Sequence, residues 1–267
     1  MIYLKSETEI EYLRESALIV SRTLAEVAKR IEPGVQTGTL DRVAEDYIKS
    51  QNATPAFKGY GNAKNPFPAS LCISVNEEVV HGIPGSYKLC EGDIVSIDCG
   101  VEKNGYFGDH AFTFCVGECD DKTRKLLKVT LESLHKGIDK ARHGNKIGDI
   151  SHAVQSHCDK EGYGVVRDLV GHGIGKSMHE EPSVPNFGKE NRGQRLRAGM
   201  SLAIEPMITM RGWQVKTLND GWTVVTSDNS IAAHYEHDIV VREGEPDILS
   251  TFDYIYEITN KRKYTVC

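Results

Sequence analysis

The chain has 267 residues, with 32 basic and 38 acidic side chains, and its formal net charge is −6. Hydrophobic residues make up 39% and charged residues 26%, which is typical of a globular protein and excludes a disordered chain. No apolar run approaches the ~20 residues needed to cross a bilayer, and the first residues lack the pattern of a signal peptide. Because charges of both signs are mixed along the chain, we expect one cytoplasmic domain over residues 1–267, with no membrane or nucleic-acid partner.

The predicted elements come in the order helix, helix, strands, and this order occurs twice. The first helix begins at the capping-box pattern Ser6-x-x-Glu9 and ends before Pro33-Gly34. Helical spacing continues over 40–48, and strand patterns follow at 71–75, 94–98 and 112–116. The second set has a helix at about 120–138 and, after a break at Gly144, another through 150–158, then strands at 165–170, 201–210, 223–226 and 234–240.

The junctions between the paired helices also repeat. Gly34-x-x-x-Gly38-x-Leu40 matches Gly144-x-x-x-Gly148-x-Ile150 at a constant offset of 110 residues. We therefore predict an α+β fold of two similar halves around a shared sheet. A single mixed domain without internal symmetry is the alternative.

A hairpin pairs two aspartates. Asn104-Gly105 lies between two strand-like runs, which is a strong signal for a two-residue turn. With this turn, paired positions sum to 209, so Asp98 and Asp109 share one face with β-carbons ~7–8 Å apart. That spacing suits two metal ions ~3.5–4 Å apart, although both side chains could instead lie in water. Because Asp98 follows the apolar run 94–97, an unpaired charge there would be costly, and a cation is favoured.

Three further side chains are candidate metal ligands. His172 lies between glycines in the run 171–175, where an ordinary turn residue is the commoner interpretation. Glu205 stands inside an apolar strand just before Pro206, and Glu236 leads into another apolar strand. With Asp98 and Asp109 they give four carboxylates and one imidazole. Two divalent ions of Mn, Fe, Co or Zn would balance the charge of −4 and support hydrolysis.

Six motifs occur in the order found in methionine aminopeptidases: Val80-His81-Gly82-Ile83-Pro84, Ile97-Asp98, Gly108-Asp109, Gly171-His172-Gly173-Ile174-Gly175, Ile204-Glu205-Pro206 and Glu236-His237. Over nearly its whole length the chain resembles this family, in its short bacterial type I form. The resemblance implies the pita-bread α+β fold, with two pseudo-symmetric helix-helix-strand halves around a central antiparallel sheet. It also implies removal of methionine from the N-termini of nascent polypeptides, near the ribosome. Nothing in the sequence indicates a partner face, so we expect a monomer.

The resemblance further implies a role for each site residue. Asp98, Asp109 and Glu236 would hold one metal ion, and Asp109, His172, Glu205 and Glu236 the other. A metal-bridging water or hydroxide would attack the first peptide carbonyl, and Glu205 would carry the proton. His179 would bind the scissile carbonyl or the next residue, and His81 would lie near the scissile nitrogen.

The pocket for the methionine side chain is expected to be small and apolar. Its predicted lining is Tyr60, Phe67, Cys72, Met178 and Trp222, although plain core packing is the alternative for Tyr60 and Trp222. The sequence departs from the family in two places: His110 stands where the family usually has Thr or Ser, and the stretch 61–68 is longer than in some relatives. An X-Pro aminopeptidase or prolidase, or a metal-free binding module on the same fold, are the alternative functions.

Overall fold

The computed structural model describes residues 2–261, which fold into helices packed against antiparallel strands. The helices are α1 (Glu7–Ala28), α2 (Thr37–Ser50), α3 (Asp121–Ile138), α4 (Ile147–Glu161) and α5 (Asp253–Lys261). The strands are β1 (Thr54–Pro55), β2 (Leu71–Val75), β3 (Glu78–Val80), β4 (Ile94–Lys103), β5 (Tyr106–Cys115), β6 (Gly164–Val165), β7 (Gly171–Gly173), β8 (Glu180–Val184), β9 (Ser201–Ile204), β10 (Met207–Thr209), β11 (Val215–Thr217), β12 (Val224–Thr226), β13 (Ala232–His234), β14 (His237–Val240) and β15 (Asp247–Ile248). None of the described helices is long and apolar enough to span a membrane.

The first helix begins as the sequence predicts. The Ser6 side chain accepts a hydrogen bond from the Glu9 N–H, and the Glu9 carboxylate accepts one from the Ser6 N–H, so the capping box is complete. One face of α1, with Leu13, Val20 and Leu24, is buried. This face packs on β4 and β5, and it anchors the hairpin that carries the two aspartates.

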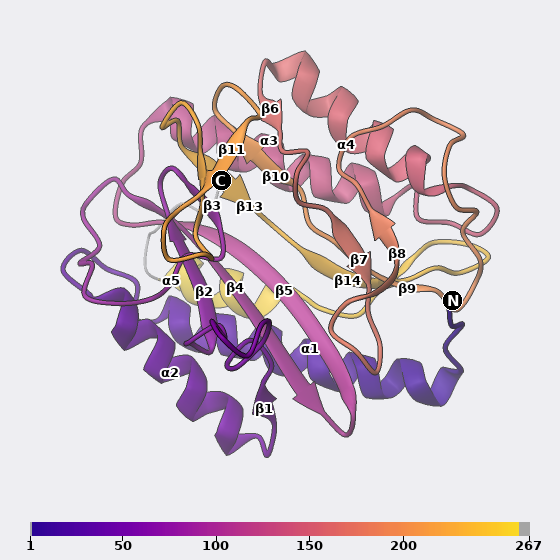
Figure 1. Cartoon of the computed structure of the whole chain (residues 1–267), viewed down its shortest axis with the longest axis horizontal. Helices are drawn as coiled ribbons and strands as arrows, with labels where there is room; N and C mark the ends of the chain where they lie inside the picture. Colours follow the sequence, from indigo (N-terminus) through magenta and orange to yellow (C-terminus); the bar gives the residue numbers. More distant parts are fainter. Residues whose placement is uncertain (1, 262–267) are drawn as a thin grey trace.

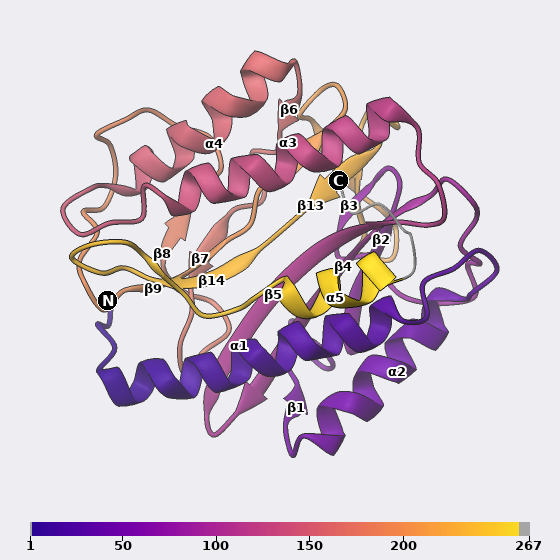
Figure 2. The same ribbon diagram turned by 180° about the vertical axis from the view of Figure 1, so that it is seen from behind.

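Most strand pairs lie within one half of the chain, and one pair, β3 with β12, joins the two halves. In the first half β4 pairs with β1, β2 and β5. In the second half the order is β15-β14-β9-β7-β8. The N–H of Glu236 donates to the carbonyl of Ala111 on β5 and so links the halves, and every strand pair is antiparallel. The strands run through the middle of the molecule in Figure 1, and α1, α3 and α5 cross in front of them when it is seen from behind in Figure 2.

The predicted internal repeat is present in detail. Helices α2 and α4 begin at Thr37 and Ile147, 110 residues apart, and each begins beside an isolated bridge, Gln36 to Lys88 and Lys146 to Arg195. Gly34 and Gly144, also 110 apart, both have positive φ angles, 92° and 89°, and each donates its N–H to a leucine carbonyl. The two-half pita-bread fold predicted from the sequence is confirmed.

Several predicted strands are wrong in extent. The run 165–170 is not one strand, because only β6 and β7 at its ends are extended and the charged pair Arg167-Asp168 turns outward to solvent. The runs 201–210 and 234–240 are each split into two strands. Helix α5 was not predicted, although Ile255 and Thr259 are buried on one face of it.

Candidate active site

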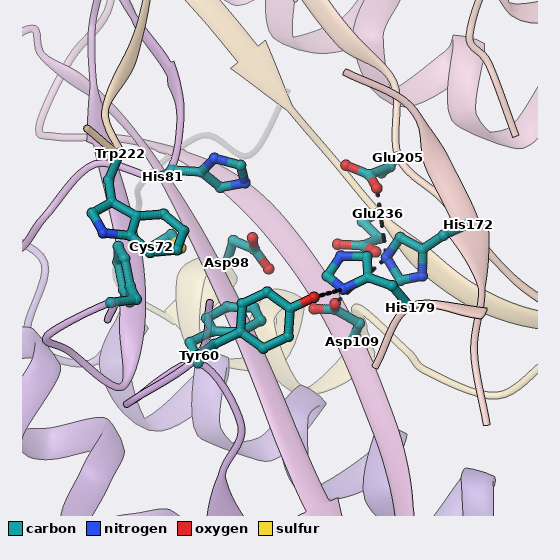
Figure 3. A pocket seen from close by; sticks show the side chains of 12 residues that line it. Tyr60, Cys72, His81, Asp98, Asp109, His172, His179, Glu205, Trp222 and Glu236 are labelled. Carbon is teal, nitrogen blue, oxygen red and sulfur yellow. Dashed lines mark hydrogen bonds and ion pairs between the residues drawn. The ribbon is translucent and has the colours of Figure 1, made fainter. Parts of the chain in front are cut away.

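A cavity of about 260 Å³ lies over the central strands, and residues from both halves line it (Figure 3). Its lining consists of an acidic and imidazole cluster on one side and an apolar wall on the other. The lining residues are Phe57, Tyr60, Phe67, Cys72, His81, Asp98, Asp109, His172, His179, Glu205, Trp222 and Glu236.

The two aspartates reach the cavity through the predicted hairpin. The turn is at Asn104-Gly105, and β4 pairs with β5 in the predicted register, with Gly100 opposite Asp109 and Asp98 opposite Ala111. Asp98 and Asp109 are therefore diagonal neighbours on one face. Among the described residues, Oδ1 of Asp98 is buried and has no hydrogen-bond partner. A buried carboxylate oxygen without a partner is costly and fits a site that takes a cation.

The two glutamates face each other where the second-half strands are interrupted. Ile204 pairs with His237 and Met207 with His234, so both pairs sum to 441 and the register is the same on either side of the gap. In that register Glu205 stands opposite Glu236, and both lie in the gap between the strands. The strand breaks thus place two carboxylates side by side.

His172 lies beside them on β7 and is not the loop residue expected from its glycine neighbours. Its partner on β9 is Ala203, which makes His172 a diagonal neighbour of Glu205. Nε2 of His172 is 3.7 Å from Glu205 Oε1 and 3.9 Å from Asp109 Oδ2. Nδ1 lies 2.9 Å from the Gly173 carbonyl. A proton on Nδ1 satisfies that carbonyl and leaves the Nε2 lone pair directed at the carboxylates, as in a metal-ligating histidine.

The electrostatics of the cluster require a positive charge. Burial raises the pKa of Asp98 to about 6 and that of Glu205 to about 8. Burial and the neighbouring carboxylates hold the pKa values of Asp109 and Glu236 well above their usual range. Like charges this close cannot all ionise without a cation. Ligand atoms of Asp109, His172 and Glu236 lie within 4.8 Å of one another, and this donor set of oxygens and one imidazole suits a divalent metal ion.

Two more histidines lie on either side of the cavity (Figure 3). His81 follows β3 in a left-handed conformation with φ of 59°, which is a strained backbone for a residue other than glycine. Its ring lies edge-on to Trp222, with the ring centroids 6.3 Å apart, and burial lowers its pKa to about 4. His179 comes just before β8, and its ring centroid is 4.2 Å from that of His172. Burial lowers the pKa of His179 as well.

The apolar wall includes four of the five residues predicted for it. Phe67, Cys72, Tyr60 and Trp222 line the cavity, whereas Met178 packs in the same apolar cluster but is not part of the lining. Tyr60 is 42% exposed, so core packing does not describe it.

Phe57 lines the cavity and was missed by the sequence analysis. A β-carbon on Gly100 would lie 2.6 Å from the Phe57 ring and 2.5 Å from Cε of Met178. Gly100, which lies opposite Asp109, therefore leaves room for both side chains. This glycine was the feature of the sequence that pointed to a bulky neighbour such as Phe57.

Beneath the cluster lie residues that sequence reasoning also missed. His234 is buried, its Nε2 is 3.5 Å from Glu205 Oε2, and neither ring nitrogen has a hydrogen-bond partner among residues 2–261. Oδ2 of Asp238 accepts the backbone N–H of Asp109. Asn186 donates from its side chain to the carbonyl of Glu205. The contacts of Asp238 and Asn186 fix the backbone of Asp109 and Glu205, two of the five candidate ligands.

His110, the departure from the family pattern, points away from the cavity. Its Nδ1 lies 2.5 Å from the carbonyl of Glu236, and its ring stacks against both His237 and Phe252, with centroid separations of 4.8 and 4.7 Å. Burial lowers its pKa to about 4. The neutral ring therefore holds the backbone at Glu236 from behind the site.

Comparison with known proteins agrees with this geometry. The profile of metallopeptidase family M24 matches residues 11–243. The chain belongs to metallopeptidase family M24. Methionine aminopeptidase from Clostridium acetobutylicum is 54% identical over 94% of this chain and 99% of its own length. The crystal structure of methionine aminopeptidase from Thermotoga maritima is 43% identical, with a TM-score of 0.91 over 94% of this chain and 100% of that one.

A third relative shares only the fold. Xaa-Pro dipeptidase from Bacillus anthracis is 22% identical, with a TM-score of 0.75 over 93% of this chain and 62% of that one. This M24 peptidase is a hydrolase that uses a divalent metal ion. Among the described residues, the group of Asp109, His172 and Glu236 can hold such an ion.

Proposed function

We propose that this M24 peptidase removes the N-terminal methionine from nascent polypeptides, as a cytoplasmic monomer acting near the ribosome and as one catalytic domain over residues 1–267. The observation that carries the proposal is the pairing of the metal-binding cluster with an apolar wall inside one small cavity. Phe57, Phe67, Cys72 and Trp222 form an apolar surface that can bury an unbranched thioether side chain. The names of the relatives at 43–54% identity support the same substrate.

We assign two divalent ions, of Co, Mn, Fe or Zn, to the cluster. Asp98, Asp109 and Glu236 would hold one, and Asp109, His172, Glu205 and Glu236 the other. The four carboxylates carry −4 when ionised, so two divalent ions balance them. When bound, such ions supply an activated water and a Lewis acid for the peptide carbonyl.

Glu205 is the residue that moves the proton. Its carboxylate is ionised when the ions are bound, and it lies at the edge of the cluster, with Oε1 3.7 Å from Nε2 of His172. An ionised carboxylate in this place accepts a proton from water and returns it to the leaving amine. The Asn186 side chain holds the backbone of Glu205 during this transfer.

The neutral histidines bind the peptide. His179 lies beside His172 and donates to the scissile carbonyl or to the following peptide unit. His81, on the side of the cavity next to Trp222, lies near the scissile nitrogen. Both rings are uncharged near neutral pH because burial lowers their pKa values, so each acts through a directed N–H or lone pair.

Comparing two peptides tests the proposal. We expect the metal-loaded enzyme to release methionine from a Met-Ala-Ser peptide and to leave an Ala-Pro-Ser peptide uncut. A chelator-stripped sample of the same preparation, before and after metal is restored, is the control. Preference for the Ala-Pro peptide would replace the methionine assignment by X-Pro specificity. Full activity after the metal is removed would contradict the metal-dependent mechanism.

A further inference from the structure

Tyr60 and His179 form a contact across the cavity that the apolar role of Tyr60 does not explain. The Tyr60 hydroxyl lies 2.7 Å from Nδ1 of His179. Figure 3 shows this bond on one side of the imidazole, with the other ring nitrogen turned toward the side where Glu236 lies. Tyr60 belongs to the first half of the chain and His179 to the second, so the bond joins the two walls of the cavity.

The position of Tyr60 is set by its own loop. The N–H of Tyr60 donates to the Phe57 carbonyl, and the N–H of Phe67 donates to the Tyr60 carbonyl. The indole Nε1 of Trp222 donates to the carbonyl of Asn65. A β-carbon on Gly61, whose φ is 93°, would lie only 2.5 Å from the Trp222 ring. The hydroxyl is thus presented to His179 by a fixed loop.

The direction of the hydrogen bond follows from the surroundings of the imidazole. In a neutral imidazole one nitrogen donates an N–H and the other accepts through a lone pair. The hydrogen bond made by one nitrogen therefore fixes the role of the other. His179 lines a cavity that also holds four carboxylates, and an ionised carboxylate only accepts hydrogen bonds. In the metal-loaded protein, an N–H on Nε2 therefore suits these surroundings better than a lone pair does. Burial and the charge of Asp109 raise the pKa of Tyr60, so its hydroxyl keeps the proton that it can donate.

We propose that Tyr60 is a positioning residue that donates its O–H to Nδ1 of His179 and so holds this histidine as the Nε2–H tautomer. In this form His179 presents a donor to the cavity, which is what a peptide carbonyl needs, whereas the opposite tautomer would present a lone pair to the carbonyl oxygen. The catalytic consequence rests on the proposed function, but the tautomer itself does not.

The tautomer is tested by long-range ¹H–¹⁵N correlation spectra of the zinc-loaded protein, with the signal of His179 assigned by its loss in His179→Ala. We expect one tautomer with the proton on Nε2 in the wild type, and a mixture of both in Tyr60→Phe. Tyr12→Phe is the matched control, because Tyr12 is 40% exposed against 42% for Tyr60 and lies outside the cavity lining. A proton on Nδ1 in the wild type, or an unchanged spectrum in Tyr60→Phe, overturns the proposal.

A double-mutant cycle tests the consequence for turnover. Tyr60→Phe should lower kcat/KM for the Met-Ala-Ser peptide about tenfold, and it should lower it no further in a His179→Ala background. Equal losses in both backgrounds would show that Tyr60 acts on the substrate directly and would overturn its role through His179. The spectra need no turnover, so a wild-type enzyme that shows the Nε2–H tautomer but releases no methionine contradicts the proposed function alone.

Discussion

At the scale of single residues, the cost of burying carboxylates without a cation dominates the site. Oδ1 of Asp98 and Oε1 of Glu236 are buried without hydrogen-bond partners among the described residues. The sequence indicated these positions because Asp98 follows the apolar run 94–97 and Glu236 leads into an apolar strand. It did not indicate His234 or Asp238, since a polar residue at the end of a strand is ordinary until its neighbours across the sheet are known.

The raised carboxylate pKa values predict how the stability of the metal-free protein depends on pH. Between pH 6.5 and 8.5 unfolded carboxyls are ionised, and the buried histidines contribute equally to the wild type and to Glu205→Gln. In the folded protein Glu205, whose pKa is raised to about 8, still binds a proton at pH 6.5 and loses it by pH 8.5. A group whose pKa is higher in the folded state stabilises the fold below that pKa, and this stabilisation is lost as the pH rises through it. Relative to chelated Glu205→Gln, we expect the unfolding free energy of chelated wild type to fall by roughly 1–2 kcal/mol over this interval.

Urea denaturation at the two pH values measures this change. In metal-loaded protein the carboxylates are already ionised, so the fall should be absent, and the stabilisation by metal should be larger at pH 8.5. A chelated wild type whose unfolding free energy changes with pH just as that of Glu205→Gln does would contradict the account of the buried carboxylates.

At the scale of elements, the local sequence determines the first-half strands but not the second-half ones. Asn104-Gly105 specifies a turn by itself, so the register of β4 and β5 and the shared face of the aspartates could be predicted. Pro206 has no N–H to donate to a sheet, so the sequence predicted an edge or an irregular strand at that point. The break at 235–236 could not be predicted, because it depends on the strand across from it. Helix α5 was missed because its short apolar face has meaning only against the core that it covers.

The contact between α1 and β5 predicts the effect of one glycine. A β-carbon on Gly108 would lie 2.5 Å from the backbone nitrogen of Ala17. Because the neighbour is helix backbone, α1 must shift, and Gly108→Ala should destabilise the protein by about 1–3 kcal/mol. The urea midpoint measures this, with Gly244→Ala as the control, since its β-carbon would meet nothing within 4 Å. Equal midpoints for the two variants would mean that the backbone of α1 does not pack closely enough on β5 to exclude a β-carbon at residue 108.

At the scale of the whole molecule, the site is a product of the two-half architecture. The first half contributes Asp98 and Asp109, and the second contributes His172, Glu205 and Glu236, so neither half alone contains the cluster. The 110-residue repeat made this arrangement visible in the sequence, because it predicts two similar units that must share a sheet. The sequence could not show how close the halves approach, and so Phe57 and the bond between Tyr60 and His179 appear only in the fold.

The central claim is that five side chains from both halves form one site that binds two divalent ions. Anomalous scattering from a manganese-soaked crystal tests it most directly, with a crystal of His172→Ala soaked in the same way as the comparison. We expect two peaks among Asp98, Asp109, His172, Glu205 and Glu236 in the wild type, and loss or weakening of the peak beside residue 172 in the variant. Manganese found only outside this cluster, or two undiminished peaks in His172→Ala, would contradict the account.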